Sequence, residues 1–234
     1  MDAPLYELKG ATRTFQRGGA SIHAVDDVDL EIAAGDFVAL EGPSGSGKTS
    51  LLQLLGALDR PSAGQVFFDG RDLARLADRE LADLRLNAFG FVFQQFNLIP
   101  TLTALENVEA GLAPTKVGSG ELRGRSLELL GEVGLAERAA HLPTQLSGGE
   151  QQRVAIARAL STEPRVILAD EPTGNLDSAS GADVIELLAG LAARRGATVI
   201  VATHNSDLAE RAPRRIAMRD GRIVESQALA SPAG

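Results

Sequence analysis

The stretch that most constrains this chain is a short apolar run followed at once by a glycine-rich loop and a leucine-rich segment. Residues 37–42 read FVALEG, residues 42–49 read GPSGSGKT, and the leucines of 48–58 recur at helical spacing. This order predicts a strand, a loop and a helix. The loop matches G-x-x-x-x-G-K-[S/T], whose glycines let backbone N–H groups turn inward around phosphate oxygens. The sequence therefore predicts a binding site for a nucleoside triphosphate.

Each part of the loop has a predicted task. Lys48 supplies a cation to the β- and γ-phosphates, and the start of the helix adds its partial positive charge. The hydroxyl of Thr49 is a ligand for Mg²⁺. The predicted nucleotide-binding residues of this loop are Gly42, Pro43, Ser44, Gly45, Ser46, Gly47, Lys48, Thr49 and Ser50.

Polar residues end two further apolar runs. Asp170 and Glu171 follow VILA, and His204 follows TVIVAT. Ligands of open α/β sheets bind beyond the carboxyl ends of the strands. We expect Asp170 to hold Mg²⁺, Glu171 to polarise an attacking water and His204 to reach a γ-phosphate. The other histidines, His23 and His141, have no such context and are interpreted as structural or surface residues.

A second glycine motif, LSGGE, lies at residues 146–150. Ser147 and Glu150 have the spacing of a capping box, which would start the helix through QQRVAIARAL. Gly148 and Gly149 place no side chains beside that helix end, so an anion has room to approach its N–H groups. Spacing alone leaves both interpretations open, a simple helix cap and an anion contact.

The order of patterns indicates an α/β fold. Alternating runs at residues 5–15, 21–42 and 64–73 predict antiparallel strands, and the runs before Asp170 and His204 predict buried parallel strands. RIAMRDGRIVES predicts a hairpin at its Asp-Gly turn. Residues 97–146 have helical patterning, broken by a predicted exposed loop, APTKVGSGEL, at 113–122. We expect one domain over 1–234, with an α/β core and β-subdomain in 1–93 and 154–234 and a helical subdomain in 94–153.

Composition excludes several other classes. The chain of 234 residues has a net charge of −8, which argues against a nucleic-acid surface as its main function. It has no cysteine, so it forms no disulfide or zinc–thiolate site. The N-terminal residues do not form a signal peptide, and no run reaches the roughly 18 apolar residues needed to span a bilayer. Any work at a membrane would therefore need another component.

The ordered motifs resemble those of ATP-binding cassette (ABC) ATPases over almost the whole chain, up to about Glu225. LSGGEQQR resembles the signature motif of that family and lies between the phosphate loop and VILADEP, as it does there. Gln94 in FVFQQF matches the Q-loop glutamine, residues 175–177 match the D-loop, and His204 matches the switch histidine. Phe15 in ATRTF matches an aromatic residue that stacks on adenine, although tyrosine is more usual there and Tyr6 lies nearby.

The resemblance implies a P-loop NTPase with a RecA-like core, an N-terminal antiparallel β-subdomain and an inserted helical subdomain. It also implies a head-to-tail pair of cassettes, either a homodimer or a pseudo-dimer. In such a pair Ser147, Gly148, Gly149 and Glu150 of one subunit would face the ATP on the other. Mg²⁺ would be held by Thr49, Gln94 and Asp170, and Asp177 would lie in the D-loop. Catalysis of ATP hydrolysis would fall to Lys48, Glu171 and His204.

Residues 90–109, GFVFQQFNLIPTLTALENVE, resemble the lipoprotein-releasing and macrolide-export type of this family. This resemblance implies a subunit that energises a separate integral membrane permease, for export or mechanotransmission, at the cytoplasmic face of a bacterial membrane. The alternative is a soluble ABC ATPase acting on DNA or ribosomes, but the chain lacks the coiled-coil insertions, zinc cysteines or second cassette that would favour it. A GTPase is disfavoured because TKVG at 115–118 lacks the aspartate of a guanine-reading motif. The cargo and the direction of transport are not encoded in these motifs.

Overall fold

The structure, a computed structural model, describes residues 3–115 and 117–228. The chain divides into two compact units, one formed by residues 1–85 and 198–234 and the other by residues 86–197. The predicted boundaries of the helical subdomain, 94–153, stay a prediction. Lys116, in the predicted loop, and residues 229–234 of the tail lie outside the described residues.

The first unit contains an antiparallel sheet, as the alternating patterns predict. Its strands are β1 (Tyr6–Arg17), β2 (Ala20–Ile32), β4 (Ala63–Phe68) and β5 (Arg71–Asp72), in the order β2-β1-β4-β5. Every second residue at the end of β2 is buried, namely Val28, Leu30 and Ile32. One face of the sheet therefore packs against the core and the other is solvated.

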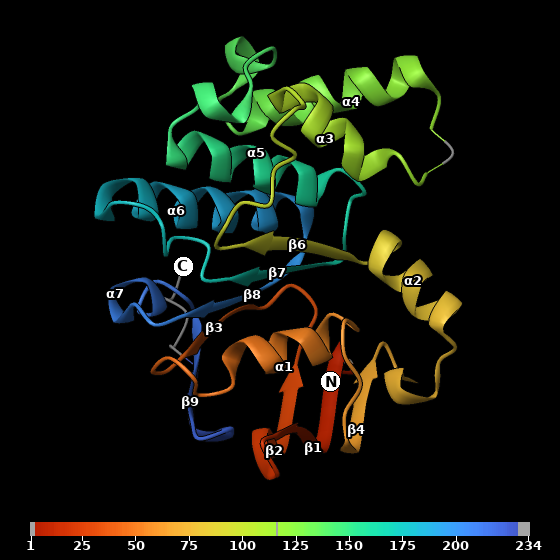
Figure 1. The fold of residues 1–234 in the computed structure, drawn as a ribbon, viewed down its shortest axis with the longest axis vertical. Coiled ribbons are helices and arrows are strands. Elements are labelled where there is room, and N and C mark those ends of the chain that lie inside the picture. Colours follow the sequence, from red (N-terminus) through yellow and green to blue (C-terminus); the bar gives the residue numbers. More distant parts are fainter. Residues whose placement is uncertain (1–2, 116, 229–234) are drawn as a thin grey trace. The chain divides into compact units, whose positions relative to one another are not determined.

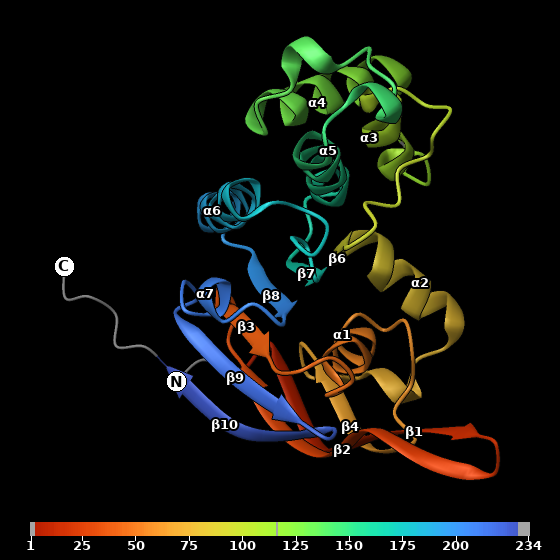
Figure 2. The same ribbon diagram turned by 60° about the vertical axis from the view of Figure 1, so that its left-hand side comes forward.

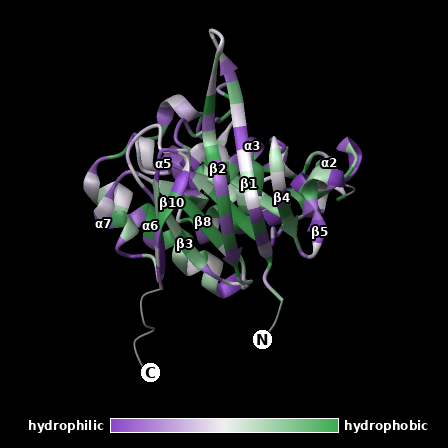
Figure 3. Cartoon of the chain, turned by 90° about the horizontal axis from the view of Figure 1, so that it is seen from below, coloured by the Kyte–Doolittle hydropathy of each residue, from purple (hydrophilic) through white to green (hydrophobic). Residues whose placement is uncertain are grey.

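The far end of the β1–β2 hairpin extends beyond β4 (Figure 3). Its turn is made by Gly18 and Gly19, both with positive φ, a conformation in which glycine has no steric penalty. Nearer the sheet, the register between the two strands shifts where Arg13 pairs with Val25 and Thr14 pairs with His23. The extra residue, Ala24, forms a bulge that bends β2 at this point.

The first unit also contains the parallel strands on which the phosphate loop is built. They are β3 (Phe37–Glu41), β8 (Thr198–Thr203) and β9 (Arg214–Arg219), with β3 parallel to both β8 and β9. β10 (Arg222–Ala228) pairs with β9 as an antiparallel hairpin through Asp220 and Gly221, which confirms the predicted turn. Helices α1 (Lys48–Leu55) and α7 (Ser206–Ala209) follow β3 and β8 (Figure 1). All six residues of β8 are buried, as expected of a central parallel strand.

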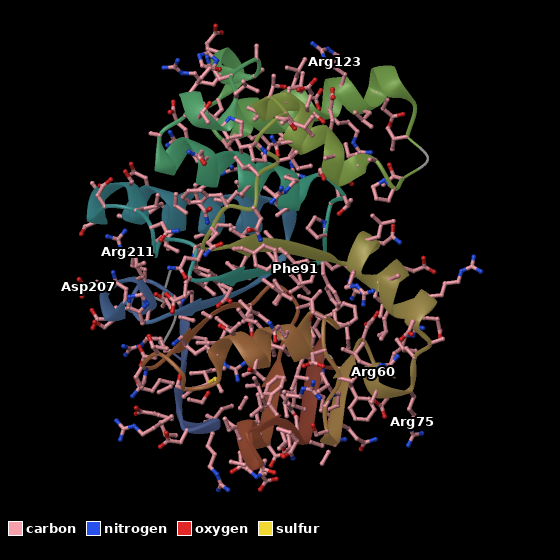
Figure 4. The ribbon with its side chains drawn as sticks, viewed as in Figure 1. Arg60, Arg75, Phe91, Arg123, Asp207 and Arg211 are labelled. Atoms are coloured by element: carbon pink, nitrogen blue, oxygen red, sulfur yellow. The ribbon has the colours of Figure 1, made fainter. Side chains whose placement is uncertain are left out.

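Arg60 fastens the segment that follows the antiparallel sheet. Its guanidinium donates to the carbonyls of Ala74 and Leu76 at 2.8 and 2.9 Å, and to Asp78 at 2.8 Å. Ala74 lies in η1 (Leu73–Arg75), and Asp78 begins α2 (Asp78–Asn87). Figure 4 shows Arg60 beside this connection. The sequence patterns did not predict α2, because within it only Leu81 is buried and no apolar face stands out.

The second unit has a pair of parallel strands and a group of helices (Figures 1 and 2). The strands are β6 (Phe89–Phe93) and β7 (Val166–Asp170). The helices are α3 (Ala104–Leu112), α4 (Ser119–Glu132), α5 (Gly148–Leu160) and α6 (Ser178–Arg195), with short turns η2 (Ala136–Arg138) and η3 (Pro143–Gln145). α5 packs against α3, α4, α6 and β6. The predicted loop at 113–122 is too long, because α4 already begins at Ser119.

Hydropathy does not single out a membrane segment. Within residues 3–115 and 117–228, every helix is too short or too polar to cross a bilayer.

Candidate functional site

The phosphate loop joins β3 to α1, as the sequence predicts, and its glycines are required by close contacts. Gly42, Gly45 and Gly47 have φ values of 151°, 80° and 104°. A Cβ atom at Gly42 would lie 2.3 Å from the carbonyl oxygen of Met218, and one at Gly47 would lie 2.1 Å from that of Ala24. Any larger residue would force these backbone segments apart, so the loop conformation depends on glycine at both positions.

A neighbouring turn and the bulge in β2 hold the loop in place. The N–H of Gly221, in the β9–β10 turn, donates to the carbonyl of Ser46 at 3.0 Å. The carbonyl of Gly221 accepts from the N–H of Asp26 at 2.8 Å, just after the bulge at Ala24. The bulge and the Asp-Gly turn therefore both pack against the loop. The sequence identified the hairpin but gave no signal that Gly221 supports the phosphate loop.

Lys48 lies inside the loop rather than in solvent. Its side chain is 5% exposed, and Nζ donates to the carbonyls of Gly42 and Pro43 at 2.7 and 3.1 Å. Pro43, Ser44, Gly45 and Thr49 are exposed, whereas Ser46 is buried. A hollow of about 260 Å³ lies here, lined by Phe15, Ala24 and residues 45–50. One hollow thus combines an aromatic ring with the amides at a helix N-terminus, a combination that suits a base and a phosphate chain.

His204 follows β8 at the same edge of the sheet as the loop. In the parallel pairing of β3 with β8, Glu41 lies opposite Thr203. Gly42 and His204 are the next residues on these two strands, so both leave the sheet at its carboxyl edge. His204 is exposed, and the next residue, Asn205, caps α7. The first unit therefore brings together Phe15, His204 and all nine predicted loop residues.

The second unit brings the acidic residues together with the Q-loop. Phe93 of β6 pairs with Asp170 of β7, so Gln94 and Glu171 leave the same edge of their strands. Glu171 has a φ of 48°, which turns the chain sharply there. The side-chain amide of Asn175 donates to the carbonyl of Gln94 at 2.9 Å. A strand pairing and a D-loop residue therefore set the position of Gln94.

The signature segment forms the predicted capping box at the start of α5. The N–H of Glu150 donates to Oγ of Ser147 at 3.2 Å, and the N–H of Ser147 donates to the Glu150 carboxylate at 2.8 Å. The hydrogen bond from the Ser147 backbone is the main cause that lowers the pKa of Glu150, so the charged form is favoured. This confirms the helix cap, and the anion contact remains a proposal.

The D-loop lies directly beside the signature glycines. A Cβ at Gly148 would lie 3.2 Å from the side chain of Leu176, and one at Gly149 would lie 3.5 Å from that of Ser180. Asp177 accepts from the N–H of Ser180 at 3.0 Å and from its hydroxyl at 2.7 Å. These bonds, led by the backbone one, lower the pKa of Asp177. The glycines therefore allow α5 and the D-loop to pack closely.

Two residues of this unit escaped the sequence patterns. Arg158 of α5 donates to the carbonyls of Phe96 and Asn97 at 2.9 and 2.6 Å, and burial lowers its pKa. Both carbonyls belong to residues with positive φ, directly after the Q-loop. Asn107 is fully buried and bonds to the backbone of Ile99 through both side-chain atoms. The one local signal for Asn107 is that it is an asparagine inside a predicted helix. No local sequence pattern singles out Arg158.

Known proteins resemble this chain closely. Residues 25–174 match the family described as ABC transporter. The chain is 51% identical over 227 residues to the macrolide export ATP-binding/permease protein MacB of Wolinella succinogenes, covering 97% of this chain and 35% of that protein. It is 50% identical over 234 residues to MacB of Marinobacter nauticus, covering 98% and 35%. The chain thus spans about a third of the length of the curated relatives it matches.

Solved structures share the whole fold. A dimeric post-hydrolysis state of the ATP-binding cassette MJ0796, bound to ADP and Pi, has a TM-score of 0.89 and 45% identity, covering 97% of this chain and 100% of that one. CbiO1 of Clostridium perfringens, part of the ABC transporter complex cbiONQ, has a TM-score of 0.87 and 27% identity, covering 97% and 90%. Fold and matches together define an ATP-binding cassette of the P-loop NTPase class. The chain belongs to the ABC transporter family.

Proposed function

We propose that two copies of this cassette bind and hydrolyse ATP between them, and that the cycle drives an integral membrane permease. The glycine loop of residues 42–47 carries this proposal most directly, because it joins the Lys48 ammonium to a hollow lined by backbone amides and an aromatic ring. These groups fit a nucleoside triphosphate, with the phosphates on the amides and the base on Phe15.

The residues also fit Mg²⁺, which prefers oxygen ligands and is usually bound through a carboxylate or two together with substrate phosphates. Thr49, Gln94 and Asp170 would hold it through their side-chain oxygens. When bound, the ion supplies neutralisation of the phosphate charge. Lys48 would leave the carbonyls of its own loop for the phosphate oxygens, where its charge stabilises the transition state.

Hydrolysis needs an activated water. The carboxylate of Glu171 would orient the water and accept its proton as the water oxygen attacks the γ-phosphorus. The bond from that phosphorus to the β,γ-bridging oxygen breaks, leaving ADP and phosphate. His204 would hydrogen-bond to the γ-phosphate and hold it in line with the water. Glu171 directly follows β7, and its φ of 48° turns the backbone sharply there, which sets the direction of its side chain.

The signature helix supplies only half of an anion site. Ser147, Gly148, Gly149 and Glu150 form a capped helix end at which Ser147 is exposed, but no lysine belongs to it. Such an end stabilises negative charge without completing a phosphate site. We infer that it contacts the γ-phosphate bound to the other cassette and that Asp177, beside it, lies at the same interface. The dimeric form of MJ0796 supports this arrangement.

The partner is inferred from the relatives. MacB is named as both ATP-binding protein and permease, and CbiO1 is part of a transporter complex. These names favour a permease over DNA or a ribosome as the partner of this chain. A permease would hold the cassette at the cytoplasmic face of a bacterial membrane, where ATP is available. The similarity to MacB further suggests export as the work performed.

The variant Glu171→Gln tests the hydrolytic assignment. It should bind ATP with an affinity close to that of the wild type, lose at least about 100-fold in kcat, and form a dimer that ATP stabilises. ATPase assays and light scattering with and without ATP measure these effects. Glu137→Gln, an exposed carboxylate on η2, is the matched control and should behave as wild type. A normal rate for Glu171→Gln would show that Glu171 does not activate the water.

A further inference from the structure

The proposed base platform, Phe15, has a cation on its ring. The guanidinium of Arg13 lies 4.6 Å from the ring centroid of Phe15. The two residues are two apart on β1, so their side chains lie on the same side of the strand. A guanidinium at this distance is attracted to the negative π-face of the ring. The contact is therefore a cation–π interaction on a ring that lines the nucleotide hollow.

Arg13 is fixed by groups from outside its own strand. Its Nε lies 2.6 Å from a carboxylate oxygen of Asp59, and both side chains are about three-quarters buried, at 25% and 24% exposure. Its Nη1 donates to Oγ of Ser62 at 3.4 Å, and that hydroxyl also accepts from the N–H of Thr14 at 3.1 Å. Asp59 and Ser62, in the segment after α1, thus hold the guanidinium through Nε and Nη1. Ordering a long, flexible arginine side chain costs conformational entropy. Here the contacts with Asp59 and Ser62 order it.

The ring of Phe15 borders both the Arg13 guanidinium and the nucleotide hollow. Phe15 lines the nucleotide hollow, whereas Arg13 is absent from its lining. The ring is 39% exposed, which leaves apolar surface for a ligand. A cation on one face draws π-electron density away from the other, so the opposite face becomes a better partner for an electron-rich base. The same contact restricts the rotation of a ring on a solvated hairpin.

We propose that Arg13 is a positioning residue that holds Phe15 as the adenine platform and strengthens its stacking on the base. This inference rests on the proposed function, in which Phe15 stacks on adenine. Arg13 touches neither the phosphates nor the reacting atoms. Its contribution is therefore confined to the base end of ATP, and it should change binding rather than the chemical step.

The decisive variant is Arg13→Met, which keeps the length of the side chain and removes its charge. We expect the KM for ATP to rise about fivefold while kcat stays within about twofold of wild type. The Kd of a β,γ-imido ATP analogue should rise by the same factor, and the Kd of inorganic tripolyphosphate, which has no base, should not change. Lys9→Met is the matched control. Lys9 is on the same strand as Arg13 and lies 5.3 Å over the ring of Phe67, which belongs to β4. This substitution should leave every value unchanged.

A double-mutant cycle separates this inference from the proposed function. Phe15→Leu should weaken binding of the analogue about tenfold or more, and Arg13→Met should then have no further effect. Asp59→Asn, which frees the guanidinium without removing it, should also raise the KM for ATP, but by a smaller factor.

An unchanged KM in Arg13→Met, or an equal effect in the Phe15→Leu background, would overturn the role of Arg13 while leaving the ATP site intact. If Phe15→Leu itself had no effect, the assignment of Phe15 as the adenine-stacking residue would be wrong as well. The phosphate site is tested separately, by whether Lys48→Ala loses ATP binding.

Discussion

At the scale of single residues, the phosphate loop is specified by the space around it. Gly42 and Gly47 lie against backbone carbonyls of two other segments, and those segments are themselves fixed by hydrogen bonds through Gly221. The loop therefore packs together with the Asp-Gly turn and the bulge at Ala24. Its motif records which positions carry glycine, and the contacts explain why a side chain is excluded there.

Substitution of Gly47 by alanine tests this packing. We expect Gly47→Ala to lower the free energy of unfolding by about 3 kcal/mol or more, because a Cβ at 2.1 Å from the Ala24 carbonyl forces the backbone to move. Gly35→Ala is the control: its φ of 80° is similar, but a Cβ there meets nothing within 4 Å. It should lose only about 1 kcal/mol, the cost of the left-handed conformation. Urea denaturation measures both values, and equal losses would show that the close contact is unimportant.

At the scale of elements, the patterns predicted what depends on local periodicity. The strands β3, β7 and β8 follow from short continuous apolar runs, and the helices α1, α5 and α6 and the capping box at Ser147 follow from helical spacing. The contact between Ala24 and Gly47, the hydrogen bond from Gly221 to Ser46 and the hydrogen bonds of Arg158 join residues far apart in the chain. A single sequence carries no local signal for such pairs, since they depend on which segments the fold brings together.

Arg158 gives a measurable example of such a pair. Arg158→Met should lower the free energy of unfolding by about 2–3 kcal/mol, because two carbonyls of residues 96 and 97 lose a charged donor in a partly buried place. Arg195→Met removes a guanidinium that pairs with Glu132 at 2.7 Å on the surface, and it should lose less than about 1 kcal/mol. Urea denaturation compares the two. A loss for Arg158→Met no larger than that for Arg195→Met would mean that the hydrogen bonds of Arg158 do not stabilise the Q-loop.

At the scale of the whole molecule, the chain carries one complete phosphate loop and one capped helix end without a lysine. If a cassette acted alone, the helix end at the signature motif would have no role in binding or hydrolysing ATP. In the proposed head-to-tail pair, each ATP would meet the loop of one subunit and the signature of the other. The pair would then be the smallest active unit, and each chain would contribute to two sites.

Mixing two inactive variants tests this claim most directly. Lys48→Ala should disable the phosphate loop, and Ser147→Arg should block the signature end while leaving ATP binding largely intact. A mixed dimer contains one site in which both parts are wild type. An equimolar mixture should therefore recover up to about a quarter of the wild-type ATPase rate, since half of the dimers are mixed and each has one of two sites. Lys48→Ala mixed with the double variant Lys48→Ala, Ser147→Arg is the control and should stay inactive. A mixture of the single variants with no more activity than either alone would contradict a signature that acts on the other subunit's ATP.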